Sequence, residues 1–150
     1  MVSWVRKALT AAAALALVAG GSASAQVPDP FARELAQKLA HAEGVLNETG
    51  YARAAGPFSG SLMQQDARRF SVMLRAGMDY RIVGVCDDRC RDLDLRLYDA
   101  NAQLIGQDTL ADAVPVIHVA PRSTGQYTVE VTLQRCGGAP CWYAVNVYSR

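Results

Sequence analysis

From Gly60 to the C-terminus, apolar and polar residues alternate, and the alternation is clearest over Asp92–Tyr98. There Leu93, Leu95 and Leu97 are separated by charged residues. Successive side chains of a β-strand point to opposite faces of a sheet, so this period of two predicts a strand with one face in a hydrophobic core. Such a strand has to be covered by a second layer, which limits the chain to a small set of β folds.

Similar segments recur along the chain with turn signals every 8 to 12 residues or so, the spacing typical of a sandwich or small barrel. Counting the segment that begins at Gly60, we expect about eight short strands. The others are Phe70–Leu74, Tyr80–Val85, Asp92–Tyr98, Leu104–Gln107, Val114–Val119, Tyr127–Leu133 and Trp142–Tyr148.

A helix is predicted before the strands. Asp29 and Pro30 look like an N-cap followed by proline in the first turn, and the helix should end near Thr49 and Gly50. One apolar stripe would pack it against the sandwich, which we favour over a partner-binding helix. The stripe is Phe31, Leu35, Leu39, Ala42 and Leu46. Residues 51–59, which include Gly56-Pro57, read as a linker.

The first 25 residues have the features of a secretory signal peptide. Arg6 and Lys7 precede the apolar run 8–19, and Ala23-Ser24-Ala25 matches a cleavage site. The run is too short to span a bilayer. We therefore expect a periplasmic or secreted protein that begins at Gln26. The expected organisation is a signal peptide over 1–25, a helix and linker over 26–56 and a β-sandwich domain over 57–150.

The charge of the exported part is close to neutral. The chain has 15 Lys and Arg against 14 Asp and Glu, and losing Arg6 and Lys7 leaves 13 against 14, a net charge of −1. This balance supplies no basic surface for nucleic acid or for anionic lipid. About 125 residues are enough for one core, so we expect a single domain without a membrane span.

The four cysteines lie in the exported part, at Cys86, Cys90, Cys136 and Cys141. An even number in an oxidising compartment indicates two disulfides, and we favour Cys86 with Cys90 and Cys136 with Cys141. The alternative is a zinc site with four thiolate ligands, which we disfavour because exported proteins seldom keep thiolates reduced.

An acidic cluster near the first cysteine pair is a possible calcium site, since calcium prefers oxygen ligands. The candidate ligands are Asp87, Asp88, Asp92, Asp94 and Asp99, with Asn101 or Asp108 as helpers. The alternative, which we favour, is that Arg89, Arg91 and Arg96 neutralise these carboxylates as ion pairs. No cofactor is required by the sequence.

Catalytic groups are scarce. The two histidines of the exported part, His41 and His118, have no recognisable nucleophile motif near them, and no G-x-S-x-G sequence surrounds Ser59 or Ser123. We predict no catalytic residue. The alternative function is a small secreted hydrolase, with or without a metal, that uses the aspartates of residues 87–94.

Aromatic residues near the C-terminus offer a possible ligand surface. Trp142, Tyr143 and Tyr148 would form an exposed aromatic row able to stack on sugars or hold an extended peptide. The alternative, which we favour, is that Tyr143 fills the core beside Val145 and Val147 while Trp142 covers the cysteine loop.

The order of these features resembles the bacterial pre-peptidase C-terminal domain, over roughly residues 57–148. The matching pieces are Gly60-Ser61-Leu62, Asp66, Phe70-Ser71-Val72, Ala76-Gly77, Tyr80-Arg81-Ile82, Asp92-Leu93-Asp94-Leu95, Leu97-Tyr98-Asp99, Pro121, Gly125-Gln126-Tyr127-Thr128-Val129 and Tyr143-Ala144-Val145. Asn101-Ala102 departs from the Asn-Gly of many members, and the two cysteine loops are not general to the family.

The resemblance implies an all-β, jelly-roll-like antiparallel β-sandwich, here with one N-terminal α-helix and as a free-standing member. Members of that family serve mainly as non-catalytic accessory or binding modules, and some similar collagen-binding domains use calcium. We therefore expect an exported binding or structural module whose partner is an envelope polysaccharide or a secreted protein.

The disulfide assignment predicts that the denatured, unreduced protein contains no free thiol, because all four cysteines are paired. Titration with a chromogenic disulfide reagent in denaturant measures this directly. Two or more free thiols per chain would contradict the assignment, and full reduction should expose four.

Overall fold

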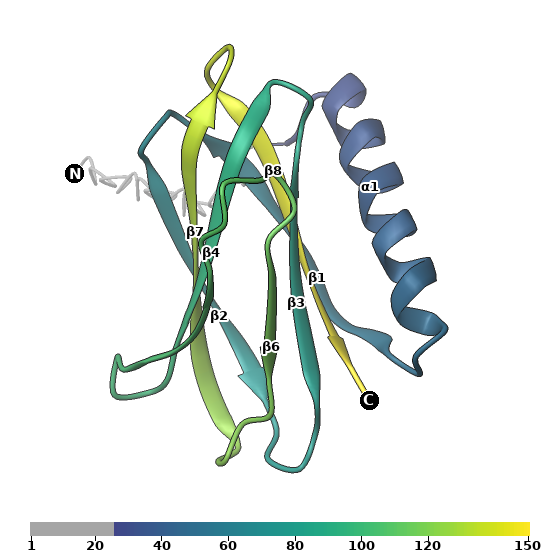
Figure 1. Ribbon diagram of the computed structural model, residues 1–150, viewed down its shortest axis with the longest axis vertical. Helices are drawn as coiled ribbons and strands as arrows, with labels where there is room; N and C mark the ends of the chain where they lie inside the picture. The colour runs from purple at the N-terminus through teal and green to yellow at the C-terminus, as the bar shows by residue number, and fades with distance from the viewer. Residues whose placement is uncertain (1–25) are drawn as a thin grey trace, which may run out of the picture.

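The computed structural model describes residues 26–150, so the predicted signal peptide lies outside the described residues. One helix precedes eight strands (Figure 1). The elements are α1 (Asp29–Asn47), β1 (Ala52–Leu62), β2 (Ala67–Leu74), β3 (Tyr80–Cys86), β4 (Cys90–Tyr98), β5 (Leu104–Asp108), β6 (Val116–Val119), β7 (Gly125–Cys136) and β8 (Cys141–Ser149).

The strands form two four-stranded antiparallel sheets packed face to face. One has the order β1-β8-β3-β6 and the other the order β2-β7-β4-β5. Eight strands that cross between two sheets in this order make a jelly roll, which confirms the predicted all-β sandwich with one helix. We call the first sheet the helix-covered sheet, because α1 lies along its outer side (Figure 1), and the second the open sheet.

The core lies between the two sheets and follows the alternation read from the sequence. Leu93, Leu95 and Leu97 of β4 are fully buried there, and they lie beside Val129 and Val131 of β7 in the open sheet. The helix-covered sheet contributes further apolar side chains from β3, β6 and β8, namely Ile82, Ile117, Val145 and Val147. Burial of these faces is the main stabilising term of such a sandwich.

Helix α1 packs on the outer side of the helix-covered sheet, as its apolar stripe predicts. Leu35 and Leu39 are buried against Val85 of β3 and Ala144 of β8. Asp29 is the first helical residue rather than the N-cap, and no side-chain hydrogen bond caps this helix. Among residues 26–150, no helix is long and apolar enough to cross a membrane.

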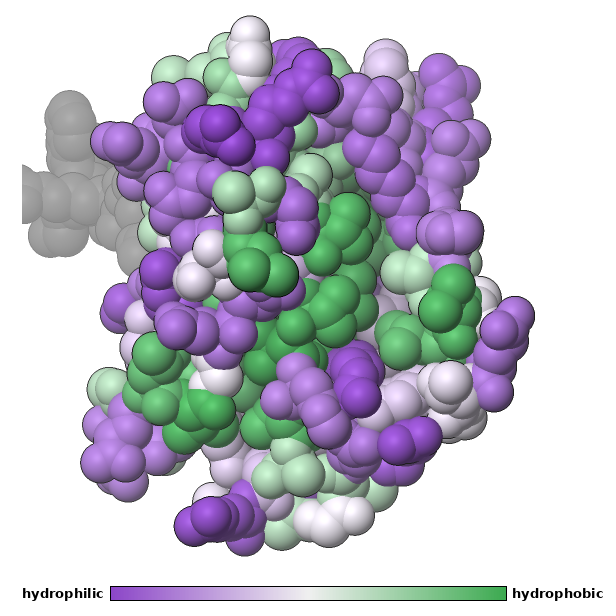
Figure 2. Space-filling view, in the orientation of Figure 1, coloured by the Kyte–Doolittle hydropathy of each residue, from purple (hydrophilic) through white to green (hydrophobic). Residues whose placement is uncertain are grey.

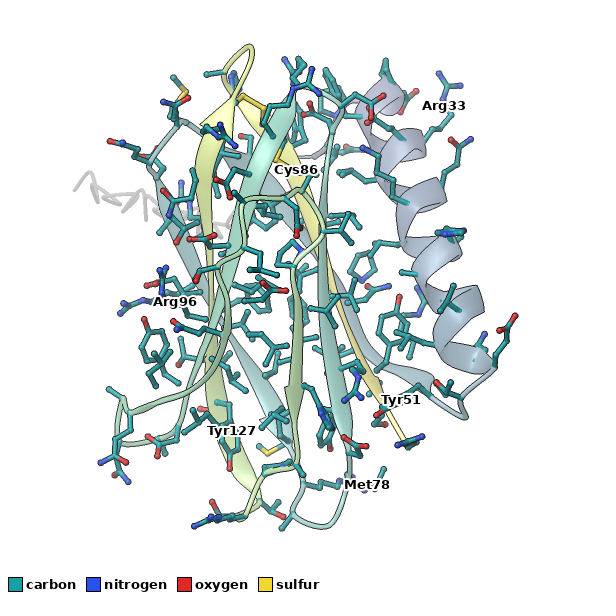
Figure 3. The ribbon with its side chains drawn as sticks, viewed as in Figure 1. Arg33, Tyr51, Met78, Cys86, Arg96 and Tyr127 are labelled. Carbon is teal, nitrogen blue, oxygen red and sulfur yellow. A yellow bond between two sulfur atoms is a disulfide. The ribbon has the colours of Figure 1, made fainter. Side chains whose placement is uncertain are left out.

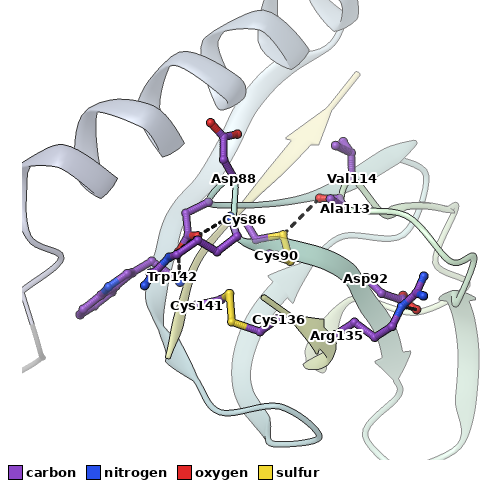
Figure 4. The surroundings of a disulfide bond; sticks show 12 residues. Cys86, Asp88, Cys90, Asp92, Ala113, Val114, Arg135, Cys136, Cys141 and Trp142 are labelled. Atoms are coloured by element: carbon purple, nitrogen blue, oxygen red, sulfur yellow. Dashed lines mark hydrogen bonds and ion pairs between the residues drawn. A yellow bond between two sulfur atoms is a disulfide. The ribbon is translucent and has the colours of Figure 1, made fainter. Parts of the chain in front are cut away.

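The two cysteine pairs lie together at one end of the sandwich (Figure 4). Cys86 is bonded to Cys90 and Cys136 to Cys141, the pairing favoured from the sequence. The amide of Gly137 donates to the carbonyl oxygen of Arg89 at 2.7 Å, which joins the two loops. The ammonium group of Lys38 donates to the Cys86 carbonyl at 2.7 Å, so α1 is attached to the same end.

The opposite end is held by a cluster around Tyr51, which Figure 3 shows below α1. The guanidinium groups of Arg81 and Arg150 lie 5.1 and 4.6 Å from its ring centre, and its hydroxyl donates to Asp79 at 2.8 Å. The hydrogen bond from this hydroxyl is the largest cause that holds the pKa of Asp79 below its ordinary value. Burial acts in the opposite direction, and the hydrogen bond from Arg150 lowers the pKa further. The cluster fixes the C-terminal strand next to the end of the helix.

The linker predicted over residues 51–59 is wrong, because strand β1 begins at Ala52 and the sandwich therefore starts before residue 57. The register of β1 against β8 shifts twice, between Arg53 and Ala55 and between Ala55 and Phe58. Bulges interrupt the alternation, and a proline is tolerated because β1 is an edge strand. The sequence signal of a strand was lost for this reason.

Gly56 lies in the second bulge of β1, where the structure leaves no room for a side chain. It has φ +103°, and a Cβ there would lie 2.7 Å from the carbonyl oxygen of Val145 and 2.6 Å from Oδ1 of Asn146. We expect Gly56→Ala to lower the free energy of unfolding by about 2 kcal/mol through backbone strain and overlap. Urea unfolding followed by circular dichroism measures the change.

Gly44→Ala is the matched control, because nothing lies within 4 Å of the added methyl group. Alanine in the middle of α1 should raise stability by up to about 1 kcal/mol. Equal effects of the two substitutions would contradict the role assigned to Gly56.

Candidate functional site

Asp87, the first candidate calcium ligand, is a buried structural residue whose side chain is 0% exposed. Its carboxylate accepts hydrogen bonds from the amides of Arg89 and Trp142 at 3.0 and 2.6 Å, and from the Arg89 guanidinium at 3.0 and 2.9 Å. Burial opposes its ionisation, but these hydrogen bonds outweigh burial and hold the pKa of Asp87 below its ordinary value. Both carboxylate oxygens are thus occupied by protein donors.

The other four carboxylates do not converge with Asp87. Asp88 is exposed and pairs with Lys38 at 2.8 Å, on a different side of the loop from Asp92 (Figure 4). Asp99 accepts from the amides of Asn101 and Gln103 at 2.8 and 2.9 Å, which closes the β4–β5 turn. These contacts are those of a turn and an ion pair.

Asp92 and Asp94 lie on β4 in separate contacts. Asp92 is 3.7 Å from Nε of Arg135, whereas Asp94 accepts from Gln134 at 2.8 Å. Burial first, and then the charge of Asp94, raise the pKa of Asp92 above its ordinary value. Within residues 26–150, no group of three or more His, Cys, Asp or Glu is placed to hold a metal ion, so calcium binding stays a prediction.

The residues considered for hydrolysis are also spread over the molecule. Nε2 of His118 lies 2.6 Å from Asp79, at the end of the sandwich opposite the cysteine loops. Ser123 lies in the loop before β7, where its carbonyl oxygen accepts from the Tyr127 hydroxyl at 2.7 Å. His41 is on α1 and Ser59 on β1. The structure brings neither histidine to the aspartates of residues 87–94.

The aromatic row considered as a possible ligand surface on β8 is not formed. Tyr143 is buried in the core beside Val145 and Val147, and Tyr148 is buried on the other face of β8, near Tyr51 under α1. Trp142 is half-buried and stacks on Phe31 of the helix, with ring centres 6.2 Å apart. The three side chains therefore stabilise the fold, and the alternative reading of Tyr143 as a core residue is confirmed.

The outer face of the open sheet carries a regular grid of polar side chains, which we call the open face. Strand pairing places Ser71, Thr128 and Tyr98 in one row across β2, β7 and β4. The next row consists of Arg69, Glu130 and Arg96 on the same three strands. Figure 3 shows Arg96 on the side of the sandwich away from α1. The alternation that buries the leucines of β4 points these groups outward.

An ionic network orders the second row. Nε of Arg69 donates to Glu130 at 2.6 Å, and the Tyr98 hydroxyl donates to the same carboxylate at 3.2 Å. The Arg69 guanidinium also lies 5.3 Å from the centre of the Tyr98 ring. The hydrogen bond to Glu130 raises the pKa of Arg69, which stays charged. Arg96 lies 3.9 Å from Glu130 and 3.6 Å from Asp94. These contacts fix the side chains before any ligand binds.

Beside this network the open face is hollowed. The hollow has a volume of about 350 Å³ and is closed on one side by the β4–β5 turn. Its lining consists of Arg69, Ser71, Tyr98, Asp99, Ala100, Ala102, Gln126 and Thr128. Ala102 in the turn has φ 59°, a left-handed conformation that favours glycine. The turn therefore keeps a strained backbone at the rim of the hollow.

Exposed apolar side chains gather at one edge of the sandwich, along β5 and the segment that leads to β6. Figure 2 shows apolar residues in the middle of this face. Leu104, Ile105, Leu110, Val114 and Val116 are exposed there, each by 40% or more. An exposed apolar edge of this kind suits contact with a protein partner.

The sequence reasoning did not single out Arg69, Ser71, Gln126 or Thr128. They come from two strands that are far apart in the chain, and they are brought next to Tyr98 only by the strand order β2-β7-β4. The available signal was that each occupies a polar position of an alternating strand. That signal predicts an outward direction but not which strands are neighbours.

Known proteins resemble this chain in structure, whereas neither comparison of sequences finds a match. No protein-family model matches the chain, and no curated protein matches it. Among solved structures, it is similar to PliG from Aeromonas hydrophila, a periplasmic lysozyme inhibitor of g-type lysozyme. The TM-score is 0.49 at 15% identity, over 67% of this chain and 86% of that one. A likeness at this level supports no argument about function.

The contacts of Asp87 predict that Asp87→Asn lowers the free energy of unfolding by about 2 kcal/mol at pH 7, because a buried charged acceptor of four hydrogen bonds is lost. The folded pKa lies below the unfolded one, so this stability is present above about pH 5 and is lost as the pH falls through the folded pKa. Urea unfolding of both proteins at pH 7 and pH 3 tests this, and the difference should shrink at pH 3.

Asp88→Asn is the control, since its side chain is 84% exposed. Its effect at pH 7 should be much smaller than that of Asp87→Asn. If the two variants lose equal stability, Asp87 does not organise the loop.

Proposed function

We propose that this chain is an exported, non-catalytic binding module that binds a neutral saccharide of the cell envelope through the hollow on the open face. The observation that carries the proposal is the row Ser71, Thr128 and Tyr98 at the floor of a polar hollow of about 350 Å³. Its volume falls within the range of small-ligand sites, which is roughly 300–1,000 Å³.

The chemistry of the lining suits a sugar. Hydroxyl groups of Ser71 and Thr128 and the amide of Gln126 can each donate and accept hydrogen bonds, as the hydroxyls of a sugar require. Tyr98 adds an aromatic ring, whose faces pack against the C–H groups of sugars. Ser71 and Gln126 are exposed to solvent, so a ligand reaches them without a change of fold.

The charge of the site favours a neutral ligand over a polyanion. Arg69 and Arg96 are balanced by Glu130 and Asp94, and Asp99 adds a further carboxylate at the rim. A polyanion would meet no net positive field in this hollow. The same balance gives no reason to expect nucleic acid as a partner.

Export and family membership, both expected from the sequence, are part of this function. Export as a periplasmic or secreted protein is supported by the two disulfides, which form in oxidising compartments. Membership in the pre-peptidase C-terminal family is retained as part of the proposal on the residues quoted for it. A secreted protein remains the alternative partner, with the exposed apolar edge at β5 as its docking surface.

Binding is tested first on an array of purified neutral and anionic bacterial polysaccharides, and then by calorimetry with an oligosaccharide of the best one. We expect retention by a neutral polysaccharide. Thr128→Val removes one hydroxyl at constant shape and should weaken binding about fivefold to tenfold, the effect of one hydrogen bond. Tyr98→Ala should weaken it more, because the ring and its contact with Glu130 are both lost.

Thr132→Val is the matched control. Thr132 lies on the same strand and the same face as Thr128, two steps along the β7 side-chain row and outside the lining of the hollow. Its affinity should equal that of the original protein. Retention by no polysaccharide, or equal effects of the two valine variants, would remove this function from the open face.

A further inference from the structure

The two sheets have four edge strands, and three of them are blocked against the addition of a further strand. Two register shifts and Pro57 interrupt β1. Strand β5 has five residues and a register shift against β4. Strand β6 has four residues and follows Pro115, and the amide of its Val116 donates to Asp108 at 2.8 Å. Bulges, prolines and short length keep an edge strand from pairing with another chain.

The remaining edge strand, β2, has none of these features. Its eight residues pair with β7 in one unbroken register and contain no proline. In the part of the chain that the structure describes, β7 is its one neighbour in the open sheet. Its other side therefore presents free backbone N–H and C=O groups. These groups are spaced to bind the backbone of an extended peptide, which adds to such an edge as a further strand.

The backbone groups that face this free edge belong to alternate residues of β2. The amide of Leu133 on β7 donates to the carbonyl oxygen of Asp66 at 3.0 Å, and this pair sets the alternation of hydrogen bonds along the two strands. Counting from it, the even-numbered residues of β2 bond to β7 and the odd-numbered ones face the free edge. The odd-numbered residues are Ala67, Arg69, Ser71 and Met73, and all four are exposed to solvent.

Apolar surface lies beside the free edge on the side toward the core. Phe58 of β1 and Phe70 of β2 stack with ring centres 4.3 Å apart, and both are partly buried against the core. An added strand would extend the open sheet and direct every second side chain toward this pair. A peptide with apolar residues at alternate positions would therefore bury apolar area on binding.

The charges along β2 specify the peptide further. Arg68 and Arg75 are exposed and seven residues apart, which is about 24 Å in an extended chain. Neither forms an ion pair among the residues that the structure describes, whereas Arg69 is bound to Glu130. Strand β2 contains no carboxylate, and Asp66 lies in the turn before it. Acidic residues at both ends of a peptide complement this edge, whereas β2 of a second copy would bring arginines next to arginines.

We propose that the free edge of β2 binds an extended acidic segment of another exported protein in antiparallel orientation. The segment has acidic residues opposite Arg68 and Arg75 and apolar residues on the side of the phenylalanine pair. Its backbone becomes a fifth strand of the open sheet. Peptide binding here uses the backbone of β2, so it does not depend on saccharide binding in the hollow, which uses side chains.

The probe is the peptide Asp-Val-Thr-Val-Thr-Val-Thr-Asp with both ends blocked, whose aspartates are separated in the same way as Arg68 and Arg75. In antiparallel orientation its valines face the phenylalanine pair, and its threonine amides face β2. Calorimetric titration of the exported protein, freed of its signal peptide, should show binding. Replacing both aspartates by lysine should weaken it more than about tenfold, because like charges then meet at both ends.

Backbone methylation separates strand addition from any other mode of binding. N-methylation of the three threonines should weaken binding more than about tenfold, because the hydrogen bonds to β2 are lost. N-methylation of the three valines is the matched control and should leave the affinity unchanged, since those amides face away from β2. Equal affinities of the two methylated peptides, the opposite order, or no binding of the original peptide would overturn the proposal.

Met73→Pro tests the same edge from the side of the protein. It removes an N–H group that faces solvent and keeps the hydrogen bonds to β7, as proline on an edge strand does. It should weaken peptide binding at least about fivefold, the effect of one hydrogen bond. Met73→Thr keeps the amide and should bind like the original protein, so equal affinities of these two variants would contradict strand addition. The methylated peptides remain decisive even where the proline variant does not fold.

The charge complementarity is tested with Arg68→Gln and Arg75→Gln, each of which should weaken peptide binding about twofold to fivefold. Arg33→Gln is the matched control, because Arg33 is exposed on α1 (Figure 3), and its affinity should be unchanged. Sedimentation velocity should show a monomer without peptide. A dimer that the peptide dissociates would identify a second copy as the occupant of the edge and refute the acidic partner.

Discussion

The burial of Leu93, Leu95 and Leu97 between the two sheets is the interaction on which the rest of this molecule depends. These side chains are fully buried, and the strand that carries them pairs with β5 and β7. Because side chains alternate along a strand, burying Leu95 and Leu97 forces Arg96 and Tyr98 outward. The core therefore sets the position of the open face. A one-residue slip in register would exchange the two sets and destroy both.

The open face shows how a sheet without a covering helix is kept polar. Glu130 and Asp94 are mostly buried by their neighbours although no second layer lies over them, and the arginines at positions 69 and 96 neutralise them. Because the Arg69 side chain is 63% exposed, its pair with Glu130 contributes little to stability. Their main effect is to hold Tyr98 and its neighbours in one arrangement, so that binding a ligand costs less conformational entropy.

The sequence predicts this fold well where its pattern is regular and local. The alternation located seven strands, the cysteine spacing indicated the two disulfides, and the helical stripe indicated α1. It failed at β1, where bulges around Gly56 and Pro57 break the period of two. Where a bulge changes the backbone geometry of a strand, apolar and polar residues no longer alternate, and the sequence no longer predicts the strand.

The functional residues were harder to predict because they depend on neighbours that are distant in the chain. Tyr143 and Tyr148 are an odd number of residues apart, so one strand cannot present both on one face. The aspartates near Cys86 are close in sequence, yet a turn and a strand point them to different partners. Ser71 and Tyr98 meet only because β7 lies between β2 and β4, and no local pattern encodes that order.

The helix-covered sheet is wider than the helix that covers it. Four strands at about 4.8 Å spacing place the outer strands about 14 Å apart, whereas a helix with its side chains is about 10 Å across. With Leu35 and Leu39 seated over β3 and β8, the edge strands β1 and β6 are left partly uncovered. A concavity on each side of α1 is therefore expected from geometry alone. The two concavities differ in their linings, because the one beside β1 includes Ala36, Ala40 and Gly44 of α1, whereas the one beside β6 includes Gln37, Lys38 and His41. The width of the sheet explains why both concavities exist, and the small residues of α1 explain why the one beside β1 stays open.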